Sequence, residues 1–157
     1  MTQASDPTLV PLGAGALALS HRPKRRDVPR FPGLGVTHVV TLLSEREGAR
    51  QVGELVEQAG MSWIWFPLDN GRPPDPARTA ALLPVIAELA ALIVGGARVV
   101  VHCSAGIHRT GMVGYAVLRR LGLEPPAARA KLLELRTVTG EGVGDDRLAW
   151  GDALVQP

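Results

Sequence analysis

The chain has 157 residues, of which 46% are apolar and 20% are charged, and its formal net charge is only +2. That length and apolar fraction suffice for one domain with a buried core, so a disordered chain is excluded. The single cysteine excludes an internal disulfide framework and favours a reducing compartment, so we expect a cytoplasmic protein. The nearly balanced charge argues against a dedicated nucleic-acid binder.

A membrane partner is not expected either. No window reaches the roughly 18 uncharged apolar residues of a membrane helix, since Pro84 and Glu88 interrupt the longest candidate, 80–94. We therefore expect a soluble protein. We also expect it to be a monomer. One basic run, 21–26, lies in a loop that extends to residue 32. Such a run can dock RNA or an acidic lipid surface, but it is more often a solvated loop.

The predicted elements alternate along the chain after a polar segment, 1–8, that is expected to fray. Apolar and β-branched segments predict strands at 14–20, 35–43, 62–66 and 98–102. Helical spacing predicts helices at 45–59, 77–94, 109–121, 125–135 and 147–154. Ser44 is expected to cap the first helix, and Pro84 to kink or restart the second. This order predicts a single α/β domain, 1–157, whose mostly parallel sheet has about four to five strands flanked by helices.

The sole cysteine lies where the strand 98–102 ends and a buried helix begins. The N–H groups of the intervening turn converge with those of the helix N-terminus, which predicts an anion-binding loop. Gly106 allows the positive φ that such a turn needs, and Arg109 offers a planar fork of donors for two phosphate oxygens. The residues expected to bind a phosphate group are Ser104, Ala105, Gly106, Ile107, His108 and Arg109.

A thiol in such a loop is expected to be a thiolate near neutrality. Because the same donors hold a phosphoryl group in line with the sulfur, covalent catalysis through a phosphocysteine follows. Thr110 can donate a hydrogen bond to the sulfur and help its departure in the second step. His102 is expected to point away from the phosphate and to brace the loop.

The leaving oxygen needs a proton, so a carboxylic acid is expected on a nearby loop. The segment 68–75 follows the end of another strand and holds two candidates, Asp69 and Asp75. Arg72, in the same loop, either contacts the substrate or is solvated. Trp63 and Trp65 precede the loop in a strand, where core packing is the better interpretation.

The segment His102–Gly111 matches H-C-x5-R-[S/T] and resembles the signature of the cysteine-dependent protein tyrosine phosphatase superfamily. From about residue 15 to 154 the chain resembles the compact dual-specificity branch, particularly the cyclin-dependent-kinase-inhibitor-type phosphatases. The resemblance implies that Cys103 is the nucleophile and Arg109 the phosphate clamp. It also implies that Asp69, in Asp-x-Gly-x-Pro, is the general acid. The stretch that would hold a water-positioning glutamine, 142–147, has none.

We therefore expect a phosphatase that needs no cofactor and acts on phosphotyrosine or phosphothreonine in proteins. A phosphoinositide, nucleotide or RNA 5′-phosphate is the alternative substrate, for which His108, Arg72 and the run 22–26 would be the evidence. A non-catalytic phosphate-binding module is a further alternative. No metal is expected, since the spacing of His102, Cys103 and His108 fits no common zinc pattern.

Overall fold

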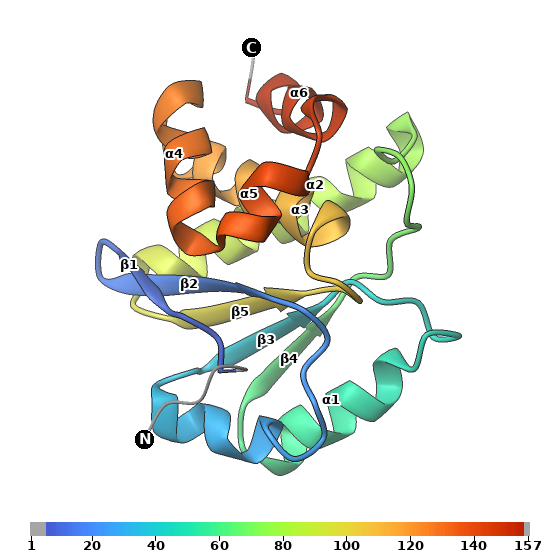
Figure 1. Ribbon diagram of the computed structural model, residues 1–157, viewed down its shortest axis with the longest axis vertical. Helices are drawn as coiled ribbons and strands as arrows, with labels where there is room; N and C mark the ends of the chain where they lie inside the picture. The colour runs from blue at the N-terminus through green and yellow to red at the C-terminus, as the bar shows by residue number, and fades with distance from the viewer. Residues whose placement is uncertain (1–5, 156–157) are drawn as a thin grey trace.

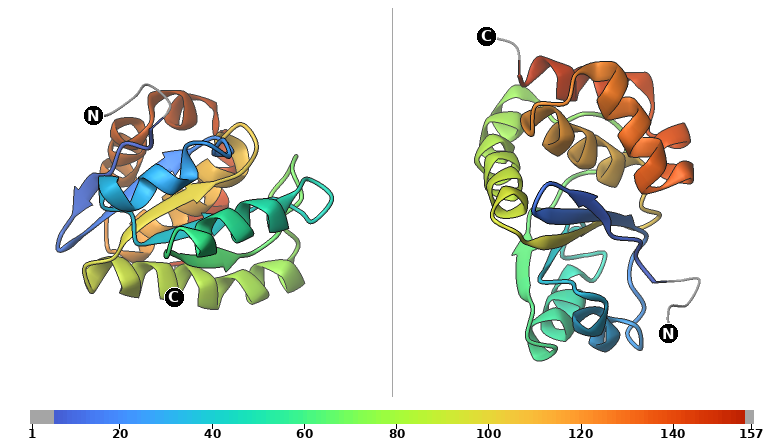
Figure 2. Two further views of the ribbon diagram at one scale, coloured as in Figure 1. Left: turned by 90° about the horizontal axis from the view of Figure 1, so that it is seen from below. Right: turned by 90° about the vertical axis from the view of Figure 1, so that its left-hand side faces the viewer.

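The computed structural model describes residues 6–155, which form one mixed sheet between two layers of helices (Figures 1 and 2). The strands are β1 (Val10–Leu12), β2 (Gly15–Ser20), β3 (His38–Thr41), β4 (Ser62–Trp65) and β5 (Arg98–His102). Their order across the sheet is β1-β2-β5-β3-β4. Only the β1–β2 pair is antiparallel, so the prediction of a mostly parallel α/β sheet is confirmed.

Strand β5 lies at the centre because both of its faces are apolar. Val99, Val100 and Val101 are fully buried, and successive side chains of a strand point to opposite faces. Val99 and Val101 pack in the larger core cluster and Val100 in the smaller one. The run of β-branched residues without alternation is thus explained by helices on both sides.

The helices are η1 (Val28–Leu34, a 3-10 helix), α1 (Ala49–Gln58), α2 (Pro76–Val94), α3 (His108–Arg120), α4 (Pro125–Leu135), α5 (Thr137–Gly142) and α6 (Asp145–Ala153). Figure 2 shows η1 and α1 on one side of the sheet and the other helices on the opposite side. The core clusters agree with this division, since Phe31 and Val52 belong to the smaller cluster and Met112 and Leu132 to the larger one.

The structure corrects several predicted boundaries. The strand expected at 35–43 covers only His38–Thr41. The helix expected from residue 45 begins at Ala49 because 45–48 form a turn, in which the Glu47 N–H donates to Ser44 Oγ at 3.3 Å. Helix α2 runs through Pro84 as one helix without restarting. Strand β1 and helices η1 and α5 were not predicted.

At the N-terminus, residues 1–5 lie outside the described part of the chain. The expected fraying of 1–8 does not hold at Asp6, whose carboxylate accepts two hydrogen bonds from Arg30, at 2.8 and 3.0 Å. Within residues 6–155, one helix, α2, has the length and composition of a membrane span, and it packs in the protein against α3 and the sheet.

The parallel register brings three strand ends to one level. Ser20 of β2 and Thr41 of β3 are both paired in register with His102 of β5. Cys103 follows His102 directly, so the loop after β5 starts beside the ends of both neighbouring strands. This edge of the sheet is where ligands bind in open α/β folds.

Candidate active site

The cysteine loop, residues 103–109, connects β5 to α3 and packs against the end of β2. Gly106 has φ +73°, and a Cβ added there would lie 2.3 Å from the carbonyl oxygen of Ser20. The Arg22 N–H donates to the Ser104 carbonyl at 2.8 Å. Glycine is therefore required at position 106 both by the backbone conformation and by the close approach of another strand.

Two side chains from the C-terminal helices bind the carbonyls of the cysteine loop from outside. Arg136 donates to Ala105 O at 3.1 Å and to Gly106 O at 2.8 Å. Thr139 donates a second hydrogen bond to Gly106 O. Because the C=O and N–H of one peptide point in opposite directions, this arrangement turns the following N–H groups into the loop. The geometry is that of an anion-binding nest.

Cys103 is only 3% exposed at the base of this loop. The hydroxyl of Thr110, in the first turn of α3, donates to Cys103 Sγ at 3.0 Å. Thr110 is itself buried, so its hydroxyl is fixed on the sulfur. The expected contact between these two residues is thus present.

Arg109 is buried and meets a partner that the sequence analysis did not identify. Its Nη1 and Nη2 donate to the two carboxylate oxygens of Glu47 at 2.8 and 3.0 Å. Nη1 also donates to the Leu68 carbonyl at 3.1 Å. The third nitrogen, Nε, is buried without a hydrogen-bond partner, as is Nε of Arg98 at the start of β5. Arg109 thus ties the cysteine loop to Glu47 and to the acid loop.

The charges in this pair stabilise one another. The hydrogen bonds from Arg109 lower the pKa of Glu47 to about 2. Glu47 in turn raises the pKa of Arg109, and the neighbouring Cys103 raises it further, while burial opposes both. The only sequence signal for Glu47 was its spacing from Ser44, which is ordinarily the sign of a helix cap.

His102 braces the loop from behind, as expected. Its Nδ1 donates to the Cys103 carbonyl at 3.0 Å, since a carbonyl can only accept. The other nitrogen, Nε2, then accepts from the Thr41 hydroxyl at 2.7 Å, which accepts from Trp63 Nε1 at 2.8 Å. Burial lowers the pKa of His102 to about 4, which favours the neutral ring that this chain of hydrogen bonds requires. Trp63 therefore has a polar role besides packing on Trp65.

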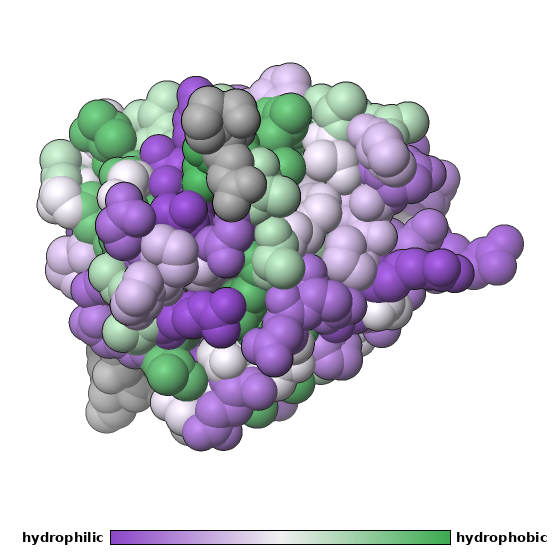
Figure 3. Space-filling model, turned by 90° about the horizontal axis from the view of Figure 1, so that it is seen from above, coloured by the Kyte–Doolittle hydropathy of each residue, from purple (hydrophilic) through white to green (hydrophobic). Residues whose placement is uncertain are grey.

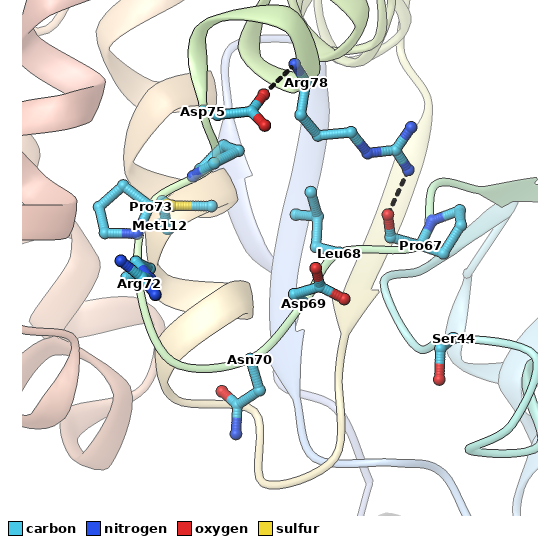
Figure 4. A pocket seen from close by; sticks show the side chains of 11 residues that line it. Ser44, Pro67, Leu68, Asp69, Asn70, Arg72, Pro73, Asp75, Arg78 and Met112 are labelled. Atoms are coloured by element: carbon cyan, nitrogen blue, oxygen red, sulfur yellow. Dashed lines mark hydrogen bonds between the residues drawn. The ribbon is translucent and has the colours of Figure 1, made fainter.

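The acid loop, residues 67–75, lies beside the cysteine loop and surrounds a cavity of about 920 Å³ (Figure 4). Its first part is fixed, because Leu68 donates to Leu42 O at 3.0 Å and accepts from Arg109. Asp69 follows Leu68 directly, is exposed, and lines the cavity. The cysteine loop itself does not line that cavity.

Asp75, the other candidate acid, occupies a structural position. It is the N-cap of α2, and its side chain accepts from the Arg78 N–H at 2.8 Å. Figure 4 shows this bond at the far end of the acid loop from Asp69. A carboxylate engaged in capping a helix is poorly placed to give up a proton to a leaving group.

The remaining predicted residues divide by exposure. Ser104, Ala105 and His108 are exposed, Ile107 is half-buried and Arg72 is exposed in the acid loop. Among residues 6–155, no group of three or more His, Cys, Asp or Glu side chains is placed to hold a metal ion.

The loop between β5 and α3 combines a buried cysteine, an arginine and a threonine hydroxyl that donates to the cysteine sulfur. In this sheet, that combination defines a cysteine-dependent phosphatase of the protein tyrosine phosphatase type. The chain belongs to the family described as PTP-SAK, Swiss Army Knife protein, DSP-PTPase phosphatase domain, which matches residues 8–146. No curated protein matches the chain by sequence.

Solved structures share the fold. Kinase associated phosphatase (KAP) is 18% identical with a TM-score of 0.70, over 98% of this chain and 94% of that one. PTPMT1 in complex with PI(5)P is 18% identical with a TM-score of 0.74, over 93% of each chain. TpbA of P. aeruginosa in complex with pTyr is 26% identical with a TM-score of 0.61, over 96% of this chain and 85% of that one.

Proposed function

We propose that the protein hydrolyses phosphomonoesters through a phosphocysteine intermediate on Cys103. The observation that carries this proposal is the buried Cys103 at the base of the loop, with the Thr110 hydroxyl donating to its Sγ at 3.0 Å and the Arg109 guanidinium beside it. An unsatisfied buried N–H costs about 1–3 kcal/mol, so a ligand that accepted from Arg109 Nε would be favoured. A phosphoryl oxygen is the matching acceptor, since guanidinium donors suit phosphate.

In the first step, the Cys103 thiolate attacks phosphorus, the S–P bond forms and the ester P–O bond breaks. Asp69 gives its proton to the leaving oxygen. In the second step water attacks, the S–P bond breaks, and the proton of the water goes to the Asp69 carboxylate. The Thr110 hydroxyl stabilises the departing thiolate through its existing hydrogen bond to Sγ. Arg109 and the N–H groups of the cysteine loop stabilise the transferring phosphoryl group in both steps.

The preferred substrate is phosphotyrosine in a protein, with phosphothreonine as the next choice. The similarity to TpbA, seen with pTyr, supports this assignment. A phosphoinositide is the second candidate, supported by the shared fold with PTPMT1, seen with PI(5)P. The exposed Lys24, Arg25 and Arg26 follow β2, which contacts the cysteine loop, and could attract such an acidic substrate.

We also propose that the enzyme works as a monomer in the reducing cytoplasm. Cys103 is not in a disulfide, and catalysis requires its sulfur to stay unoxidised so that the thiolate can attack. In the face shown in Figure 3, apolar and polar residues are interspersed, so this face offers no large apolar surface to a second copy.

The test is hydrolysis of phenyl phosphate and 4-nitrophenyl phosphate, with and without EDTA. We expect activity that EDTA does not change and that Cys103→Ser abolishes. Asp69→Ala is expected to slow phenyl phosphate by about 100-fold or more, and 4-nitrophenyl phosphate far less, because that leaving group needs no proton. Asp75→Ala should lose about 1 kcal/mol of stability and keep its activity.

Three outcomes would contradict the proposal. An inactive wild type that still binds phosphate would indicate a non-catalytic binding module. Loss of activity in EDTA would mean that a metal takes part. A normal leaving-group dependence in Asp69→Ala, together with an altered one in Asp75→Ala, would move the acid to Asp75. Phosphopeptides and phosphoinositides compared at equal concentration then decide between the two substrate classes.

A further inference from the structure

The C-terminal helix α6 reaches the acid loop through one buried arginine. Arg147, in the first turn of α6, is only 9% exposed. Its Nη2 donates to the Gly71 carbonyl, 76 residues away in sequence, and its Nη1 donates to Val143 O at 3.2 Å. Gly71 lies two residues after Asp69, so the contact lies on the far side of the candidate general acid.

The two sides of Asp69 are held differently. Before Asp69, the Leu68 N–H donates to the Leu42 carbonyl and the Leu68 carbonyl accepts from Arg109. Arg78 also donates to the Pro67 carbonyl (Figure 4). After Asp69, the backbone between Asp69 and Pro73 accepts a side-chain hydrogen bond from Arg147, and from no other side chain among residues 6–155. The cavity of about 920 Å³ inside the loop leaves little packing there to replace that bond.

Helix α6 is a rigid support for this contact because it is fixed to α3. Asp152 of α6 accepts from the Tyr115 hydroxyl at 2.6 Å and from Arg119 Nε at 2.8 Å. Gly151 lies so close to Tyr115 that a Cβ added there would be 2.7 Å from the ring. Helix α3 also carries Arg109 and Thr110 in its first turn. Gly71 is thus held, through Arg147 and α6, by the same helix α3 that positions the cysteine loop.

We propose that Arg147 is a positioning residue for the general acid. By holding Gly71, it keeps Asp69 at the distance from the cysteine loop that proton transfer to the leaving oxygen requires. The inference rests on the proposed function, in which Asp69 is that acid. It also gives a role to Arg147 in the segment 142–147, which holds no glutamine that could position the hydrolytic water.

A residue that acts through the acid affects only substrates that need the proton. Phenyl phosphate leaves as a basic phenoxide, so its reaction depends on protonation. An aryl phosphate with an acidic leaving group depends on it little. Misplacement of the acid by about 1 Å costs on the order of 100-fold for the first kind of substrate. A merely destabilising substitution would instead lower the rate for all substrates alike.

The experiment measures kcat/KM for aryl phosphates of increasing leaving-group pKa, in the wild type, Arg147→Met and Arg147→Lys. Met keeps an unbranched apolar side chain, although a shorter one, and removes the donors, whereas Lys keeps the charge and one donor nitrogen. Arg120→Met is the matched control, because Arg120 is exposed at the C-terminal end of α3, away from the start of the helix that carries Arg109 and Thr110. Thermal unfolding verifies that each variant is folded.

For Arg147→Met we expect a loss of about 10- to 100-fold on phenyl phosphate and less than about 3-fold on the most acidic leaving group. Arg147→Lys should lie between this variant and the wild type. It also provides the readout if Arg147→Met does not fold. Arg120→Met should follow the wild type across the series. An equal loss at every leaving group, or no loss at all, would overturn the inference.

A double substitution separates this inference from the proposed function. In the Asp69→Ala background, Arg147→Met should cost little more, because a residue that acts through Asp69 has nothing left to position. Additive losses would overturn the positioning role and leave the acid intact. If Asp69→Ala alone leaves the leaving-group dependence unchanged, the acid assignment fails, whatever the result for Arg147.

Discussion

Arg109 is the residue at which three loops meet. It belongs to the cysteine loop, binds the acid loop at Leu68 O, and forms a bidentate pair with Glu47 of the turn before α1. A buried guanidinium needs a negative partner, because desolvation of an unpaired charge is costly. Glu47 supplies that charge through Nη1 and Nη2 and does not bind Nε. Arg22 stabilises the turn that contains Glu47, because its side chain donates to the Glu47 carbonyl.

The first prediction concerns Glu47→Gln, which keeps the shape of the side chain and removes its charge. We expect a loss of about 1–2 kcal/mol in the free energy of unfolding, reduced from the value for a buried pair because the Glu47 side chain is 36% exposed. Urea denaturation measures it. Glu45→Gln is the control, since the Glu45 side chain is 69% exposed and its pair with Arg50 lies on the surface. Equal effects of the two substitutions would show that the pair with Arg109 contributes nothing specific.

At the scale of elements, the cysteine loop is fixed by its neighbours on both sides. The end of β2 approaches it at Gly106, and the region after α4 binds its carbonyls through Arg136 and Thr139. The loop therefore keeps its shape without a bound anion. Such preorganisation is what makes a phosphate-binding loop effective, since no energy is spent on ordering it during the reaction.

Gly106→Ala tests that arrangement against Gly122→Ala, which ends α3. Both glycines have positive φ, +73° and +99°, but only at Gly106 would a Cβ collide with backbone, at 2.3 Å from Ser20 O. We expect Gly122→Ala to cost about 1–2 kcal/mol of stability for the backbone strain, and Gly106→Ala to cost more because the collision adds to that strain. Only Gly106→Ala should also lower kcat/KM, by about 100-fold, because the loop must shift. Normal activity in a folded Gly106→Ala variant would contradict the requirement for this close approach.

At the scale of the whole molecule, two groups make stability depend on pH in the same direction. Glu47 has a pKa of about 2, below its ordinary 4.5, and His102 has a pKa of about 4, below its ordinary 6.5. For both groups the unfolded chain takes up a proton at higher pH than the folded protein does. Stability therefore rises with pH through both intervals.

We expect the free energy of unfolding to fall as the pH decreases from 6.5 to 4, where His102 is protonated only in the unfolded chain. It should fall again from 4.5 towards 2, where the contribution of Glu47 is lost. Urea denaturation at a series of pH values measures the profile. His102→Asn removes the first titration, so its profile should be flatter between pH 6.5 and 4. The same slope in this variant and in the wild type would mean that His102 is not the group responsible.

Much of the fold could be predicted because its signals are local. The β-branched run at 98–102 and the helical spacing at 125–135 depend only on nearby residues, and both elements lie where expected. Strand β1 and helix α5 could not be predicted in this way. The first contains Pro11 in three residues, and the second has two glycines in six. Pairing with β2 and packing against α3 and α4 form them despite poor propensities.

The alternation of the longer strands and helices, the loop expected to bind an anion and the pairing of Thr110 with Cys103 could be read from the sequence, because each is a short-range relation along the chain. The distant partners of Arg109 and Arg147 could be found only in the folded protein. Arg109 meets Glu47 across 62 residues, and Arg147 meets Gly71 across 76. In the unfolded chain every arginine side chain is solvated by water, so the residue type alone does not indicate which group an arginine will bind after folding. Packing of the surrounding helices removes the water and makes that choice.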